Sequence, residues 1–69
     1  MKGKLFIPTV NRIYRNKNGS SYRCVESSLE RTVFINILSG WMLNAHEVRM
    51  YDDGTIDWDY SEGGHFVRI

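Results

Sequence analysis

Apolar and polar residues alternate most regularly on either side of Asp52-Asp53-Gly54, in the last third of the chain. An Asp-Gly pair between two alternating runs is typical of a β-hairpin. A two-residue loop would place Met50 opposite Asp57 and would mix apolar with charged side chains on both faces. A three-residue loop places Met50 opposite Ile56 instead. Burial favours this second register, because a slip of one residue turns every side chain to the other face.

In this register Gly54 takes the left-handed position of a bulged turn, and Arg49 lies opposite Asp57. The predicted core face of the hairpin consists of Val48, Met50, Ile56, Trp58 and Tyr60. One pair is unfavourable, since Glu47 lies opposite Asp59 and like charges across a ladder repel. We therefore expect the ladder to bend or end near residues 45–47.

Other short apolar runs predict further strands, and three of the segments leave the type of element open. The residues 41–51 include good helix formers behind Ser39, although their alternation favours a strand. Residues 27–30 form a loop or one helical turn. The chain ends in a short strand, or in a 3₁₀ turn and a strand, over residues 65–69. The remaining predicted strands cover residues 4–7, 10–15, 21–26 and 31–38.

Several residues define the character of these strands. Pro8 stops the first one, which makes it an edge strand or a strand end. In the second, Ile13 and Tyr14 are the predicted buried residues. Asn18-Gly19 predicts a hairpin turn. Apolar residues on both faces of residues 31–38, with Phe34 and Leu38 opposite Val33, Ile35 and Ile37, predict a central strand.

These elements predict a mostly β fold in one domain over residues 1–69, either a five- to six-stranded SH3-like barrel or a rolled antiparallel sheet. The glycines at 63 and 64 are expected in a loop between two strands, over residues 61–64. The segments Ile13–Gly19 and Tyr22–Val25 resemble the first hairpin of SH3-like domains. That resemblance concerns the fold and implies no function.

A chain of 69 residues buries a small core, so a homodimer is one predicted form. The single Cys24 cannot form an internal disulfide, and one unpaired cysteine fits a reducing, cytoplasmic setting. No signal peptide and no run of membrane-spanning length is visible, which predicts a protein without a membrane partner.

The net charge of +1 hides a separation, because residues 1–25 contain no acid and residues 26–69 contain all eight. The two parts are expected to pair with each other as neighbouring strands. The basic part also suggests a nucleic-acid interface, since cations neutralise phosphates and aromatic rings stack on bases. The candidate residues are Arg12, Arg15, Lys17, Arg23, Tyr14 and Tyr22, with Lys2 and Lys4 nearby.

A second candidate surface is acidic and lies on the predicted hairpin. A rigid hairpin that displays several carboxylates can engage a basic groove on another protein. Its residues are Asp52, Asp53, Asp57, Asp59 and Glu62. A solvated outer face is the alternative interpretation of either charged set.

No catalytic or metal-binding constellation is apparent. Cys24, His46 and His65 are residue types that bind zinc, but none of their spacings matches a known ligand pair. Cys24 shares a strand face with Tyr22, which predicts a buried core thiol rather than a nucleophile. We expect no metal, no cofactor and no enzymatic activity.

Part of the chain resembles short uncharacterised proteins of Gram-positive bacteria and their phages or mobile elements. The shared residues are Ser39-Gly40-Trp41, Ala45-His46, Tyr51–Ser61 and Gly63–Phe66, within a likeness that covers residues 22–66. The resemblance implies no activity. Our leading hypothesis is a small binding protein that inhibits or modulates a larger host protein with a basic surface, in an anti-defence role such as that of an anti-CRISPR inhibitor. The alternative is nucleic-acid binding.

Overall fold

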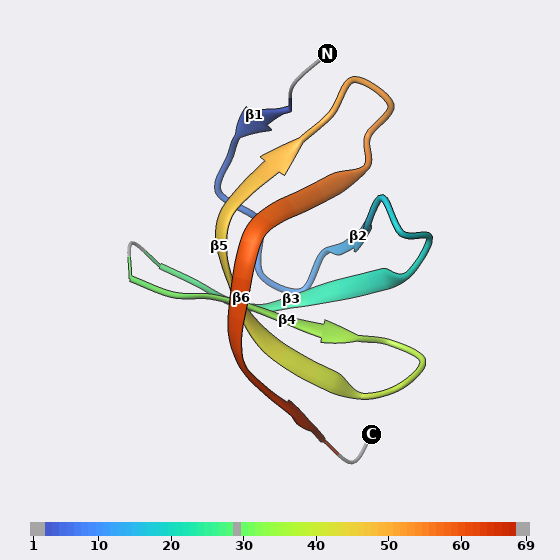
Figure 1. Ribbon diagram of the computed structural model, residues 1–69, viewed down its shortest axis with the longest axis vertical. Helices are drawn as coiled ribbons and strands as arrows, with labels where there is room; N and C mark the ends of the chain where they lie inside the picture. Colours follow the sequence, from blue (N-terminus) through green and yellow to red (C-terminus); the bar gives the residue numbers. More distant parts are fainter. Residues whose placement is uncertain (1–2, 29, 68–69) are drawn as a thin grey trace.

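The computed structural model describes residues 3–28 and 30–67, and within them all regular structure is β-strand (Figure 1). The mostly β prediction is thus confirmed, and of residues 41–51, predicted as strand or helix, Trp41–Met50 form a strand. The strands are β1 Lys4–Leu5, β2 Ile13–Arg15, β3 Ser21–Ser27, β4 Thr32–Asn36, β5 Trp41–Met50 and β6 Ile56–Phe66. None of the described residues belongs to a helix that could cross a membrane.

The strands form one antiparallel sheet in the order β1-β5-β4-β3-β2, and β6 pairs with β5. β5 pairs with β4 through its first half and with β1 at its end, while β6 follows it along nearly its whole length. The described strands leave the sheet open, so a closed barrel is not present. A single parallel bridge between Asn16 and Ile56 brings the end of β2 to the start of β6.

The β5–β6 hairpin has the register that the sequence predicts. Met50 pairs with Ile56, and Arg49 with Asp57. The amide of Tyr51 donates to the carbonyl of Thr55, and the amide of Gly54 donates to the carbonyl of Tyr51, both at 2.9 Å. Gly54 has φ 85°, which a glycine adopts without steric cost. The three-residue loop is therefore confirmed.

The turn between β2 and β3 is built in the same way. The amide of Asn16 donates to the carbonyl of Ser20 at 2.7 Å, and the amide of Gly19 donates to that of Asn16 at 2.9 Å. Gly19 has φ 94°. The side chain of Asn18 accepts from the amide of Ser20 at 2.8 Å. The hairpin predicted at Asn18-Gly19 is therefore confirmed.

The side-chain alternation of β5 shifts by one residue at Glu47. Leu43, Ala45 and Val48 are buried, whereas strict alternation would bury residue 47 in place of 48. Glu47 has φ 57°, which is rare for a residue other than glycine. The predicted bend near residues 45–47 is present: the ladder has no pair at Glu47 and resumes in the same register on either side. Figure 1 shows β5 and β6 curving together along their length.

The core lies on the concave side of this curved sheet. Phe34, fully buried on the central strand β4, stacks on Trp58 at 5.3 Å between ring centroids. Tyr14 and Tyr22 meet Phe34 edge-to-face, each at 6.3 Å. Such aromatic pairs contribute about 0.5–1.5 kcal/mol each beyond burial. The buried cluster consists of Tyr14, Tyr22, Cys24, Phe34, Leu43, Ala45, Val48 and Ile56.

The predicted loop over residues 61–64 is wrong, because β6 continues to Phe66. Met42 pairs with His65 and Asn44 with Glu62, so β6 carries one extra residue opposite Leu43. This is a β-bulge, and Gly63 in it has φ 66°. The two glycines increase the twist of the strand without ending it. Of the predicted terminal strand, residues 68–69 lie outside the described part of the chain.

Three burial predictions are also wrong. Ile13 is 55% exposed because it lies on the outer face of β2, opposite Tyr14. Leu38 is 89% exposed because β4 ends at Asn36 and a turn follows. Tyr60 is 58% exposed, since the shift at Glu47 turns its strand partner His46 away from the core. The edge position predicted for residues 4–7 is confirmed for β1, which pairs with β5 alone.

Candidate functional site

The acidic candidate residues lie on the β5–β6 hairpin, and the tip is fixed by a side chain. The Oδ1 atom of Asp53 accepts the amide of Thr55 at 3.0 Å and its hydroxyl at 2.6 Å. These hydrogen bonds hold the pKa of Asp53 below its usual range, and the nearby charge of Lys17 acts in the same direction. Asp52 beside it is exposed. The tip therefore presents an ionised carboxylate in a defined position.

Lys17 belongs to the predicted basic set, yet it contacts the acidic hairpin. Its Nζ atom lies 3.9 Å from the centroid of the Tyr51 ring, a cation–π contact. Its amide donates to the carbonyl of Ile56 at 3.0 Å. At this point the basic and acidic parts of the chain meet within the fold, as the sequence predicted for neighbouring strands.

The two acids on β6, Asp57 and Asp59, make different contacts from those that the predicted β5–β6 register suggested. Arg49 lies opposite Asp57, but its Nε atom lies 3.6 Å from Oδ1 of Asp59, a diagonal contact. Asp57 instead accepts the amide of Trp58, at 2.8 Å from its Oδ1. Both acids occupy the same face of β6 because they are two residues apart. The arginine neutralises part of this face.

Glu47 is a further acid near this face; the sequence indicated it only as an unfavourable like-charge partner of Asp59. It lies across the ladder from Asp59 and is hydrogen-bonded to that carboxyl group, and this contact and its negative charge raise the pKa of Glu47 above its usual range. Arg49 opposes the effect. The predicted like-charge pair exists, and the Arg49 guanidinium partly offsets it.

Glu62 is separate from the other acids. Its Oε1 atom lies 2.7 Å from Nε2 of His46, and the His46 ring stacks on Tyr60 with centroids 4.5 Å apart. Glu62 is thus paired with His46, whereas Asp59 is paired with Arg49. The five predicted acids therefore do not share one set of contacts.

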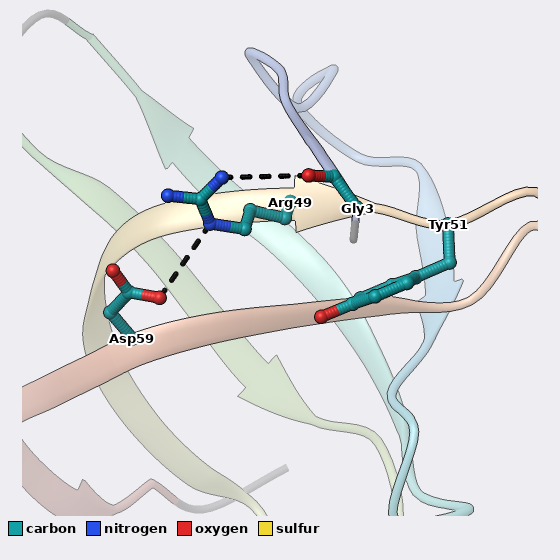
Figure 2. Close-up of a pocket in the computed structure, with 4 residues that line it drawn as sticks. All are labelled: Gly3, Arg49, Tyr51 and Asp59. Carbon is teal, nitrogen blue, oxygen red and sulfur yellow. Dashed lines mark hydrogen bonds and ion pairs between the residues drawn. The ribbon is translucent and has the colours of Figure 1, made fainter. Parts of the chain in front are cut away.

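A pocket of about 330 Å³ lies where the start of the chain crosses this hairpin (Figure 2). It is lined by Gly3, Arg49, Tyr51 and Asp59. The Nη1 atom of Arg49 donates to the carbonyl of Gly3 at 3.4 Å. A Cβ on Gly3 would lie 3.0 Å from the Tyr51 ring, so any larger residue there would require the ring to shift. Sequence reasoning missed the pocket because Gly3 and Arg49 are 46 residues apart.

The aromatic residues of the basic set are unavailable for stacking on bases. Tyr14 and Tyr22 are 8% and 7% exposed and lie in the core. The hydroxyl oxygen of Tyr14 accepts the amide of Thr9 at 2.9 Å. Their place in the proposed nucleic-acid surface is therefore corrected, because alternation turns them inward while Arg23 faces out.

The basic side chains of that set do lie at the surface. Arg12, Arg15 and Arg23 are exposed, and Arg15 and Arg23 occupy the outer face of β2 and β3. The Arg12 guanidinium lies 5.9 Å from the centroid of the Tyr14 ring. Lys2 lies outside the described residues. The structure thus brings Arg15 and Arg23 to one face, while Lys17 contacts Tyr51.

Cys24, His46 and His65 do not gather. Cys24 is fully buried, its thiol donates to the carbonyl of Glu26 at 3.6 Å, and burial raises the pKa of the thiol. His65 Nδ1 lies 3.1 Å from the carbonyl of Gly63. Within residues 3–28 and 30–67, no three His, Cys, Asp or Glu side chains are placed to hold a metal ion.

Comparisons with protein-family models, with curated proteins and with solved structures give no match for this chain.

Proposed function

We propose that this chain is a small, non-enzymatic binding protein that engages a basic surface of a larger protein through the acids of the β5–β6 hairpin. One observation carries the proposal: Asp53 at the tip is fixed by two hydrogen bonds from Thr55 and stays ionised well below neutral pH. Asp52, Asp57 and Asp59 extend the charge along the tip and one face of β6.

An acidic surface of this kind is suited to binding another protein rather than to catalysis. Carboxylates held on a hairpin lose little conformational freedom on binding, so more of the interaction energy is retained. Complementary charge raises the association rate and disfavours acidic partners. Salt screens these contacts, since the Debye length is about 8 Å at physiological ionic strength. Binding that weakens with added salt is therefore expected.

The proposal extends to biological role and setting. A short chain with an acidic hairpin suits an inhibitor encoded by a phage or mobile element, acting in the cytoplasm against a host defence protein, as anti-CRISPR proteins do. The buried, unpaired Cys24 is compatible with a reducing setting. The proposed fold is an incompletely closed, SH3-like barrel, and the bridge between Asn16 and Ile56 supports it because it brings the end of β2 to the start of β6.

The test is capture of a partner by the immobilised chain, identification by mass spectrometry and titration of the purified partner by calorimetry. A variant with Asp52, Asp53, Asp57 and Asp59 all changed to Asn is expected to lose at least about tenfold in affinity. The control changes Glu26, near the end of β3, and Glu30, in the loop between β3 and β4, to Gln. Equal binding by the Asn variant and the wild-type chain would end the proposal.

Nucleic-acid binding is the second candidate, and the exposure of Arg12, Arg15 and Arg23 favours it. It predicts affinity for DNA or RNA that falls steeply with salt. Changing the three arginines to Gln is expected to abolish retention on either polymer at low salt. No retention of the wild-type chain under those conditions would remove this candidate.

A further inference from the structure

The central strand β4 has buried residues on both of its faces, and the core covers only one of them. Phe34 belongs to the core cluster, whereas Val33 and Ile35, which alternate with it, point to the opposite face of the sheet. Val33 is 4% exposed and Ile35 is 6% exposed, yet neither is part of that cluster. The sheet therefore carries a second, smaller apolar layer on its outer face.

Further side chains extend this layer across the outer face. Residues that pair directly across a ladder share a face of the sheet. One such row crosses β2, β3, β4 and β5 and consists of Ile13, Arg23, Ile35 and Met42. β3 bulges at Val25, opposite Val33. At the other end of β4, the amide of Ile37 donates to the carbonyl of Ser21 at 3.1 Å, so the pairing with β3 continues for one more residue.

These side chains form an outer apolar patch. Its members are Ile13, Val25, Val33, Ile35, Ile37 and Met42. Around the buried pair on β4, Met42 is half-buried, and Ile13, Val25 and Ile37 are exposed. An exposed apolar patch that polar residues surround marks a site of interaction with another molecule.

Glu62 borders this patch on the β6 side. It pairs with Asn44, and its Oε1 atom lies 2.7 Å from Nε2 of His46. Both of these partners alternate with Ala45, which is buried in the core, so both point to the outer face. The Glu62 carboxylate therefore lies at the outer face as well, and its side chain is exposed.

The charges on the two sides of the patch are of opposite sign. Arg15 and Arg23 are exposed on β2 and β3, and Glu62 is exposed on β6. Since β4 and β5 lie between β3 and β6, three strand spacings, or about 14 Å, separate Arg23 from Glu62. This distance is too long for an ion pair within one chain, so the two complementary charges can meet only between molecules.

A surface with an apolar centre and opposite charges on its two sides is complementary to itself. We propose that the outer apolar patch binds the same patch of a second copy of this chain about a two-fold axis near β4, with Arg23 of each copy facing Glu62 of the other. Such a contact uses the same surface on both copies, and each pairing occurs twice. The axis exchanges β3 with β5, so Val25 of one copy lies over Met42 of the other.

Charge favours a second copy over other occupants. A nucleic acid would meet the arginines but would bring phosphates against Glu62, and an acidic protein would bring carboxylates there. A second copy offers both signs of charge and an apolar centre. A chain of 69 residues buries a small core, and association adds to it. The acids of the proposed function lie outside the patch, so this dimer leaves them free.

Sedimentation equilibrium of the full chain from about 1 µM to about 1 mM tests the proposal. Wild type is expected to dimerise reversibly in this range. Arg23→Glu and Glu62→Arg are each expected to weaken the dimer at least about tenfold, and the double variant to return to within about threefold of wild type. Restoration cannot arise within one chain, because the two positions are about 14 Å apart. Lys4→Glu and Glu30→Arg make the same charge changes outside the patch and are expected to have no effect.

A second pair of variants tests the apolar centre. Val25→Lys places a charge in the patch and is expected to abolish the dimer. Leu38→Lys is the matched control, since Leu38 lies outside the patch in the turn after β4 and is exposed. A sample that mixes isotope-labelled and unlabelled wild-type chains is expected to show intermolecular NOEs between the methyl groups of Val25 and Met42. This measurement needs no variant, so it decides the arrangement even if thermal unfolding shows that a substitution prevents folding.

Three outcomes would overturn the two-fold arrangement. The first is a wild-type chain that stays monomeric at the highest concentration; if it then retains DNA or RNA through Arg23, nucleic acid is the occupant of the patch. The second is a dimer that tolerates Val25→Lys, because its interface would lie elsewhere. The third is a pair of charge reversals that each weaken the dimer and that the double variant does not restore.

Discussion

Glu47 and Asp59 lie near each other where the β5–β6 ladder is interrupted, between the pairs His46–Tyr60 and Val48–Trp58, and Glu47 has φ 57° there. A positive φ inside a strand turns Ala45 and Val48 both toward the core, and it turns His46 outward. The same residue therefore marks the bend of the sheet, the start of the acidic face and the point where β1 replaces β4 beside β5.

Replacing Glu47 with glycine is expected to stabilise the fold. Glycine adopts a positive φ without the steric cost of a Cβ, which is about 1–2 kcal/mol, and it loses more entropy on folding. We expect a net rise of about 1 kcal/mol in the free energy of unfolding, measured with urea. Glu47→Gln is the control, since it removes the charge and keeps the strain. A less stable glycine variant would show that the left-handed geometry is not limiting.

The contribution of Glu47 to stability depends on pH. Its pKa is raised in the folded state, so the folded protein binds this proton more tightly than the unfolded chain. The contribution is full below the unfolded value of about 4.3 and is lost as pH rises through the folded pKa. Glu47→Gln resembles the protonated form. Its melting temperature is expected to match wild type near pH 4 and to exceed it near pH 6; a constant difference would contradict this.

Asp53 has the opposite dependence, because its folded pKa is lowered by the hydrogen bonds from Thr55. Its contribution is present above the unfolded value of about 3.9 and is lost as pH falls through the folded pKa. Asp53→Asn is expected to be less stable than wild type at neutral pH, and the gap should close in acid. Asp52→Asn is the matched control at the same turn. Parallel melting curves of Asp53→Asn and wild type at all pH values would refute the role.

Gly64 is expected to tolerate no side chain. A Cβ there would overlap the indole of Trp41, which packs against the core. Gly64→Ala is expected to lower the free energy of unfolding by about 1–3 kcal/mol, as overpacking does, and to change the Trp41 fluorescence. Gly63→Ala is the comparison: its Cβ meets no atom within 4 Å, so only its φ of 66° opposes the change. An unchanged fluorescence in Gly64→Ala would argue against the contact.

The turns and the pairing of the β5–β6 hairpin follow from local sequence. Gly19 and Gly54 supply the positive φ that their loops need, and the period-two pattern beside Gly54 leaves only one register that buries a whole face. The central position of β4 follows in the same way from apolar residues on both of its faces. These features depend on residues a few positions apart, so the chain order alone is sufficient to predict them.

The tertiary structure decided the features that depend on distant residues. The indole of Trp41 lies where a Cβ at position 64 would be, so only glycine fits there. Gly63-Gly64 accordingly form a bulge within a strand rather than a loop. The bend at Glu47 placed Tyr60 outside the core and Glu62 beside His46. The Arg49 side chain contacts the carbonyl of Gly3 and the carboxylate of Asp59 rather than Asp57, the residue opposite it in the ladder. Which side chains share a face of a strand follows from the local sequence. Which of the two faces points into the core is decided only when all the strands of the curved sheet have packed together.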